Sequence, residues 1–188
     1  MREEVDAILK EAKARMAKAV EVLAHDLASI RTGRASPALV ENIRVDYYGT
    51  PTPLKQLATI TTPEARLIVI QPWDRSLIKA IEKAIQQSDL GVIPTDDGTV
   101  IRIALPPLSE ERRRELAKVV RQRVEQGRVA VRNVRRDAHD HLRRLEREHK
   151  LSEDEFRRAE QELQRLTDSF IKEVDQLGEA KEEEVLQV

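Results

Sequence analysis

Three long stretches of the chain repeat apolar residues at intervals of three or four positions, with charged residues between them. They run from residue 3 to 30, from 109 to 147 and from Ser152 onwards. This spacing aligns apolar side chains along one side of an α-helix. Each stretch therefore predicts a long amphipathic helix, and three such helices can cover one another's apolar sides in a three-helix bundle.

The second predicted helix combines an apolar stripe with a separate basic side. Its stripe consists of Ala117, Val120, Val124, Gly127, Val131, Val134, Ala138, Leu142 and Leu145. At 100° per residue the stripe is centred about 80° from Arg128, whereas a second set of residues lies within about 40° of Arg128 on the other side. We call this set the basic face; it consists of Arg121, Arg128, Arg132, Arg135 and His139.

The segment from residue 38 to 105 follows a different pattern, in which apolar and polar residues alternate over short runs. Such alternation is typical of half-buried strands. Strands are predicted over 43–47, 57–61, 66–70 and 99–105, and a helix over 77–85. Residues 49–53, which contain glycine and two prolines, are predicted to form a turn.

These elements predict an α+β fold, in which a small β/α/β domain is inserted between the first and second helices of a long three-helix bundle. The bundle would comprise residues 1–30 and 107–188, and the small domain residues 31–106. Because the chain crosses between the two parts twice, we expect a hinge at the crossings. Its residues would be Arg31, Thr32, Gly33, Arg34, Ala35, Ser36 and Pro37, together with Ala104, Leu105, Pro106 and Pro107.

Composition narrows the class of protein. The 188 residues are 40% hydrophobic and 36% charged but only 3% aromatic, which favours helical packing over a β-sandwich. The absence of cysteine rules out disulfides and thiolate metal ligands. No apolar run reaches the roughly 18 residues that a membrane helix needs, and the start of the chain does not resemble a secretion signal. We therefore expect a cytoplasmic protein without a membrane partner.

The net charge of −1 hides a strong asymmetry between two helices. Residues 108–147 contain 13 Lys or Arg against 7 Asp or Glu, whereas residues 148–188 contain 6 against 13. One interpretation of the basic face is therefore a surface paired with the acidic third helix. However, residues 126–136 contain no acid that could neutralise the arginines from within their own helix. A surface left this positive suits the phosphate backbone of a structured RNA recognised by its shape.

The sequence contains no clear catalytic, metal-binding or nucleotide-binding motif. His139 and His141 point to different sides of their helix, and His25 and His149 have no neighbour at a metal-ligand spacing. No glycine-rich nucleotide loop with its lysine is present. We therefore expect neither an enzyme nor a bound cofactor or metal, and any energy-consuming step must come from a partner.

Five segments of the chain resemble the signature segments of the bacterial ribosome recycling factor family. They are Arg31–Pro37, Tyr47–Leu54, Ser88–Gly91, Pro106–Arg113 and Arg128–Ala138. The match follows the whole chain in order. The resemblance implies a three-helix bundle that carries a small β/α/β domain.

The resemblance also implies a function in translation. Such a factor enters the 70S ribosome after termination and, with elongation factor G and GTP, splits it into subunits, so that mRNA and deacylated tRNA leave. By motif position, Arg132 would be the principal contact to large-subunit rRNA, supported by Arg128, Arg135 and Arg136. The small domain and the hinge would meet elongation factor G. We expect a monomer.

Two other classes of function stay open on the residues alone. A helical adapter or chaperone could use the basic face to bind an acidic protein surface, and its binding would survive nuclease treatment. A hydrolase would need a pocket with convergent titratable groups, for which the sequence offers no constellation.

Overall fold

The computed structural model describes residues 2–187 and has the predicted α+β fold. The chain divides into two compact units. One contains the chain up to Leu27 together with Lys118–Glu183, and the other contains Ala28–Ala117 together with the chain from Glu184. We call them the bundle unit and the small unit.

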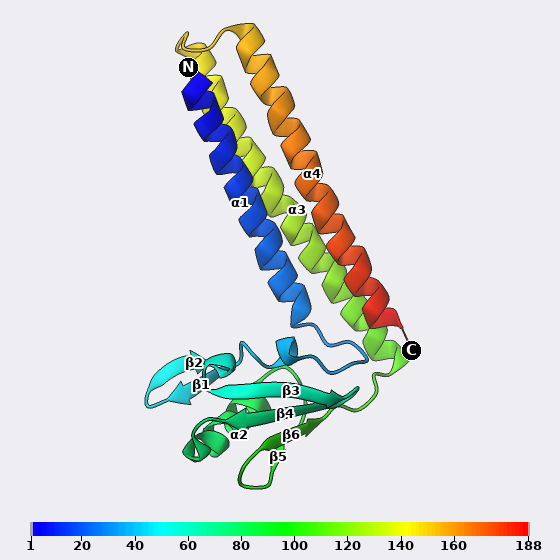
Figure 1. Ribbon diagram of the computed structural model, residues 1–188. Helices are drawn as coiled ribbons and strands as arrows, with labels where there is room; N and C mark the ends of the chain where they lie inside the picture. The colour runs from blue at the N-terminus through cyan, green and yellow to red at the C-terminus, as the bar shows by residue number, and fades with distance from the viewer. Residues whose placement is uncertain (1, 188) are drawn as a thin grey trace. The chain divides into compact units, whose positions relative to one another are not determined.

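The bundle unit consists of most of three long helices: α1 (Arg2–Ala28), α3 (Glu110–Arg147) and α4 (Glu153–Leu186). They lie along one another, with α3 and α4 running in opposite directions (Figure 1). The predicted apolar stripes are turned inward. The most deeply buried side chains are Met16 of α1, Val120, Val131 and Leu142 of α3, and Leu163 and Val174 of α4. The confirmed helices thus bury the surface that each would otherwise expose to water.

Two glycines allow the helices to approach closely. A Cβ atom on Gly178 of α4 would lie 2.5 Å from Cγ2 of Val124 on α3. A Cβ atom on Gly127 of α3 would lie 3.0 Å from Cδ2 of Leu23 on α1. Both glycines are buried, so the backbone itself forms part of the bundle's interior.

Polar caps start the two helices that follow the small unit. The Ser109 hydroxyl accepts a hydrogen bond from the Arg112 amide at 3.0 Å at the start of α3. At the start of α4 the Ser152 hydroxyl accepts from the Glu155 amide at 3.1 Å, while the Glu155 carboxylate accepts from the Ser152 amide at 3.2 Å. This reciprocal pair is a capping box, which satisfies two amides that have no partner within the helix.

The small unit contains two antiparallel sheets and one longer helix. Strands β3 (Ala58–Glu64), β4 (Leu67–Pro72), β6 (Ile101–Ala104) and β5 (Thr95–Asp96) form one sheet in that order. Strands β1 (Arg44–Tyr47) and β2 (Thr50–Pro53) form a hairpin. The helix is α2 (Ile78–Gln87), and short 3₁₀ helices cover Pro37–Leu39, Leu54–Gln56 and Arg75–Leu77.

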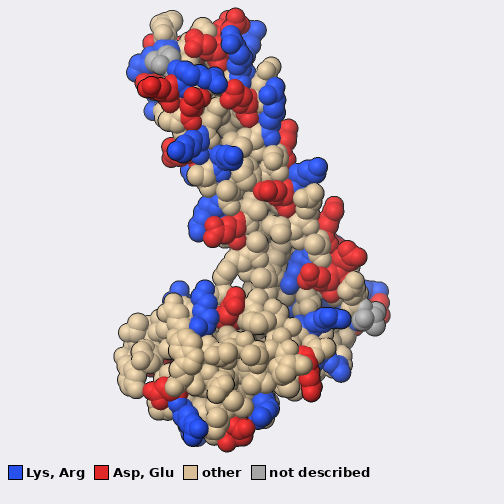
Figure 2. Space-filling model, in the orientation of Figure 1, with Lys and Arg blue, Asp and Glu red and all other residues tan. Residues whose placement is uncertain are grey.

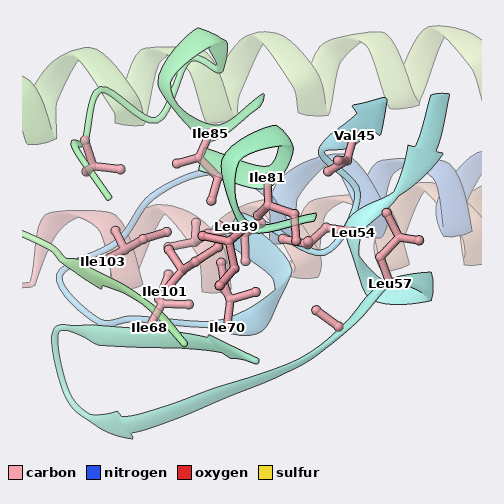
Figure 3. Close-up of a cluster of buried hydrophobic side chains, with 14 of the residues drawn as sticks. Leu39, Val45, Leu54, Leu57, Ile68, Ile70, Ile81, Ile85, Ile101 and Ile103 are labelled. Carbon is pink, nitrogen blue, oxygen red and sulfur yellow. The ribbon is translucent and has the colours of Figure 1, made fainter. Parts of the chain in front are cut away.

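A single hydrophobic core holds these elements together (Figure 3). Ile68 and Ile70 of β4 are fully buried with Ile101 and Ile103 of β6. Ile81 and Ile85 of α2 complete the cluster, joined by Val45 of β1 and by Leu39 and Leu54 of two 3₁₀ helices. The helix predicted over 77–85 and the strands are confirmed, because their apolar positions face this core.

The turn predicted over residues 49–53 is wrong in part, since Thr50–Pro53 pairs with β1 as strand β2. Tyr48 and Gly49, both with positive φ, make the actual turn. Proline lacks the amide that a sheet interior requires, but each strand of a two-stranded sheet has a free edge. Pro51 and Pro53 are therefore compatible with β2. For a similar reason β3 continues through Pro63 to Glu64, beyond the predicted end at residue 61.

Candidate nucleic-acid interface

All the residues of the basic face lie on α3, but their side chains differ in exposure. The side chain of Arg132 is 53% exposed, whereas that of Arg128 is 32% exposed. Arg121 and Arg136 are exposed, and Arg135 and His139 are half-buried. The helix thus supplies one row of cations, of which some reach solvent and others lean against α4.

Acids of α4 pair with two of the arginines. Nε and Nη2 of Arg121 donate to the Glu182 carboxylate at 2.9 and 2.6 Å. Nε of Arg128 donates to Asp175 at 2.7 Å, and its Nη1 donates to Glu125 of α3 at 3.0 Å. These bonds raise the pKa of Arg128, with Asp175 the main cause. Both guanidinium groups are therefore engaged within the protein.

His139 also belongs to the contact between α3 and α4. Its Nδ1 lies within hydrogen-bond distance of the Glu160 carboxylate, and its ring meets Phe156 edge-on at 6.0 Å between ring centres. Figure 2 shows acidic and basic side chains next to one another along the visible part of the helices. The interpretation of the basic face as a surface paired with the acidic helix thus describes Arg121, Arg128 and His139.

Among the residues that the structure describes, the remaining arginines are weakly paired or unpaired. Nη1 of Arg132 lies 3.9 Å from Glu125, a long and weak ion pair shared with Arg128. Within residues 2–187, Arg135 and Arg136 have no acidic partner. Arginine offers a planar fork of donors that matches phosphate oxygens. Arg132, Arg135 and Arg136 are therefore the part of the predicted set that is available to an RNA backbone.

The pairing between α3 and α4 left a signal in the sequence that the prediction missed. Arg121 and Arg128 are seven residues apart on α3, and Asp175 and Glu182 are seven apart on α4. Antiparallel helices bring equally spaced residues together in reverse order. Matching the spacing of the arginines against the spacing of acids on the last helix places both pairs among a few candidates, which also include Asp168 with Asp175 and Glu155 with Glu162.

The predicted hinge residues are all placed in the small unit. Arg31 donates a hydrogen bond from Nη2 to the carbonyl oxygen of Pro106, which joins the two connecting segments. Burial and the nearby charge of Arg112 lower the pKa of Arg31. The Ala35 amide bonds to the Ala65 carbonyl at 2.6 Å, and the Leu105 amide to the Arg66 carbonyl at 2.8 Å. Bending at these segments stays a prediction.

The structure also bears on metal binding and on membrane insertion. Residues 2–187 contain no group of three or more His, Asp or Glu side chains that could hold a metal ion. In the same range, no helix combines the length and the apolar character that crossing a bilayer requires.

Comparisons with known proteins give consistent results along nearly the whole chain. The model of the family described as ribosome recycling factor matches residues 23–186. A ribosome-recycling factor of Carboxydothermus hydrogenoformans is 56% identical over 184 residues, which cover 98% of this chain and 100% of that protein. The ribosome-recycling factor of Roseiflexus sp. (strain RS-1) is 58% identical over the same shares of both chains.

Two solved structures resemble this chain in fold as well as in sequence. The solution structure of a ribosome recycling factor matches with a TM-score of 0.78 and 51% identity, over 98% of both chains. The second belongs to models of the T. thermophilus ribosome recycling factor and E. coli elongation factor G bound to the E. coli post-termination complex. It matches with a TM-score of 0.68 and 51% identity, over 97% of this chain and 99% of that chain.

Proposed function

Because this chain belongs to the ribosome recycling factor family, we propose that it binds the 70S ribosome after termination and splits it into subunits. Elongation factor G and GTP hydrolysis would supply the energy, and mRNA and deacylated tRNA would leave. The structure of a relative bound together with elongation factor G to a post-termination complex supports this assignment. The chain would act in the cytoplasm, as a monomer, without catalysing a reaction or binding a cofactor.

The observation that carries the proposal is the charge of Arg132, only weakly paired with Glu125, and that of Arg135 and Arg136, unpaired within residues 2–187, on a helix of 38 residues. A helix of this length, packed against two others, is a stiff support. Arginines fixed on it can dock onto rRNA phosphates without a large loss of conformational freedom. Arg121 and Arg128 would join them only by exchanging their carboxylate partners for phosphates.

A stiff bundle also suits the mechanical part of the proposal. Elongation factor G would push on the small unit, and the hinge segments at Arg31–Pro37 and Ala104–Pro107 would allow it to turn. The bundle would convert this push into displacement of the contacts between the ribosomal subunits. Arg31, through its hydrogen bond to Pro106, would make the two segments move together.

The test of the interface is the Arg132→Glu substitution. We expect it to weaken binding to the large ribosomal subunit by at least about tenfold at low salt, because a phosphate contact is replaced by repulsion. The slope of log K against log salt concentration should fall by about one. Subunit splitting should slow in parallel, while circular dichroism shows unchanged helicity.

Arg165→Glu is the matched control, because Arg165 is an exposed arginine of α4 and the change in charge is identical. It should bind and split subunits like the parent protein. Equal binding of Arg132→Glu and the parent would refute the interface. Binding to subunits that resists nuclease digestion of the rRNA would point instead to a protein partner.

A further inference from the structure

Three further arginines gather at the end of α3 that leads into the turn before α4. Arg143, Arg144 and Arg147 line a hollow of about 590 Å³ together with His139 and Asp140. Only His139 of its lining residues belongs to the basic face, and no step of the proposed function uses the three arginines. Asp140 is the one acid that lines it, so the hollow carries a positive charge.

The three arginines differ in how they are held. Arg143 lies with its guanidinium carbon 5.5 Å from the centre of the Phe156 ring, and its Nη1 lies 3.9 Å from Glu146. Within residues 2–187, no acid pairs with Arg144 or Arg147. Arg143 is thus anchored by its stacking, while the other two keep free donors.

This concentration of like charge has a cost for the helix. Arg147 follows Arg144 by three residues and Arg143 by four, and like charges at these spacings repel. Cations near a helix C-terminus do interact favourably with its dipole. One cation in the last turn would already satisfy that interaction, so the dipole does not account for three arginines around one hollow.

The hollow continues a row of exposed arginines along α3. Arg132, Arg136, Arg143 and Arg147 lie within about 60° of one another around the helix, at 100° per residue. At 1.5 Å per residue the row is about 22 Å long. This length matches several successive phosphates of one nucleic-acid strand.

We propose that Arg143, Arg144 and Arg147 form a second RNA contact, which binds a phosphodiester of the large-subunit rRNA beyond the segment bound by Arg132. Arg144 and Arg147 supply the donors, and Arg143, held by Phe156, fixes the wall of the hollow. The inference rests on the proposed function, since it assumes that the bundle docks on rRNA. It extends the interface from the middle of α3 to its C-terminal end.

The experiment compares the double substitution Arg144→Gln/Arg147→Gln with the parent protein. Affinity for the isolated large ribosomal subunit is measured between 50 and 300 mM salt, a range over which the Debye length falls from about 14 Å to about 6 Å. We expect binding at least about tenfold weaker at the lowest salt and a log–log salt slope smaller by about two. The matched control is Arg157→Gln/Arg165→Gln, which removes two arginines from α4 and should bind like the parent.

The outcomes separate this inference from the proposed function. If Arg132→Glu weakens binding and Arg144→Gln/Arg147→Gln leaves both affinity and salt slope unchanged, the second contact is refuted and the first stands. If neither variant affects binding, the docking of the bundle on rRNA fails as a whole. A loss of thermal stability with unchanged affinity would show that the arginines serve the helix end alone, and would also refute the second contact.

A crosslink identifies the class of partner. The chain has no cysteine, so Asp140→Cys places one unique thiol in the hollow without removing an arginine. A photoreactive maleimide attached there, irradiated on the large subunit, should crosslink to rRNA. Crosslinks to ribosomal protein without rRNA would overturn the proposal.

Discussion

Arg128 and Arg132 lie one helical turn apart on α3, yet their surroundings give them different properties. Arg128 is held by Asp175 and Glu125, whereas Arg132 extends into solvent beside a distant Glu125. A guanidinium engaged by two carboxylates must lose both before it can bind a phosphate. At the scale of single residues, exposure and pairing therefore decide which arginines can bind RNA.

Gly178 is the glycine whose added side chain would meet the closest neighbour. A methyl group at this position would lie 2.5 Å from Cγ2 of Val124, closer than atoms can pack. Alanine favours a helix over glycine by about 1 kcal/mol, but overpacking a core costs about 1–3 kcal/mol. Because the contact at 2.5 Å is severe, the upper part of that cost range applies, and we expect Gly178→Ala to lower the free energy of unfolding by about 1–2 kcal/mol, measured by chemical denaturation.

The second substitution Val124→Ala provides the check, because it removes the methyl group that collides. The double variant should be more stable than the sum of the two single effects predicts. Gly178→Ala with unchanged or increased stability would contradict the close approach of α3 and α4 at this point.

Sequence patterns predicted the arginines themselves, but their state depends on residues far along the chain. Arg121 and Glu182 are 61 positions apart, and Arg128 and Asp175 are 47 apart. The charge of a single helix says nothing about such partners, which depend on how two helices are packed. For the same reason the sequence did not reveal the importance of Gly178. Its lack of a side chain matters only because Val124 of another helix lies against it.

At the scale of elements, Ser152 and Glu155 determine where α4 begins. Ser152→Ala removes the hydroxyl that accepts the Glu155 amide, and we expect a loss of about 1 kcal/mol in the free energy of unfolding. The serine's hydrogen bonds, chiefly that from its backbone amide, lower the pKa of Glu155 below its ordinary 4.5. The bond to the ionised carboxylate therefore contributes above about pH 4.5 and disappears as the pH falls through the lowered value.

Denaturation of the parent and of Glu155→Gln at pH 7 and at pH 3 measures this contribution. The difference between the two proteins should shrink at the lower pH. A difference that stays constant would show that the glutamate's charge has no role in the cap.

Ser169→Ala is the control for the change at Ser152, because Ser169 is an exposed serine within α4.

The long helices were predictable from the sequence because each repeats one spacing over many turns. The helix predicted over 109–147 spans Glu110–Arg147, and the one predicted over 3–30 spans Arg2–Ala28. The strands are short, and their pairing depends on partners elsewhere. Strand β2 escaped prediction because Pro51 and Pro53 are typical of turns, while an edge position in a hairpin accepts them.

At the scale of the whole molecule, the proposed hinge leads us to expect motion between the two units. Because the chain has no cysteine, pairs of spin labels can be placed uniquely. Labels at Lys83 of α2 and Lys172 of α4 should give a broader distance distribution than labels at Lys10 of α1 and Lys172, which share the bundle unit. Pulsed electron resonance measures both.

A distribution between the units as narrow as the one within the bundle would exclude a working hinge. Adding Arg31→Ala tests the hydrogen bond to Pro106. Without this bond the two connecting segments can move separately, so the distribution should broaden further. Arg34→Ala, an exposed arginine in the same segment, should leave it unchanged.

The small unit lies between α1 and α3 in the sequence, and this order affects how the chain folds while it is being synthesised. The core of the small unit lies between Leu39 and Leu105, one continuous stretch that can pack as soon as it has been synthesised. Helix α1 is made first, but Leu163 and Val174, which help to enclose it, are made last. At about 5–20 residues per second, its apolar stripe waits roughly seven to thirty seconds for them. During that interval the nascent chain offers a chaperone an amphipathic helix that the finished protein conceals.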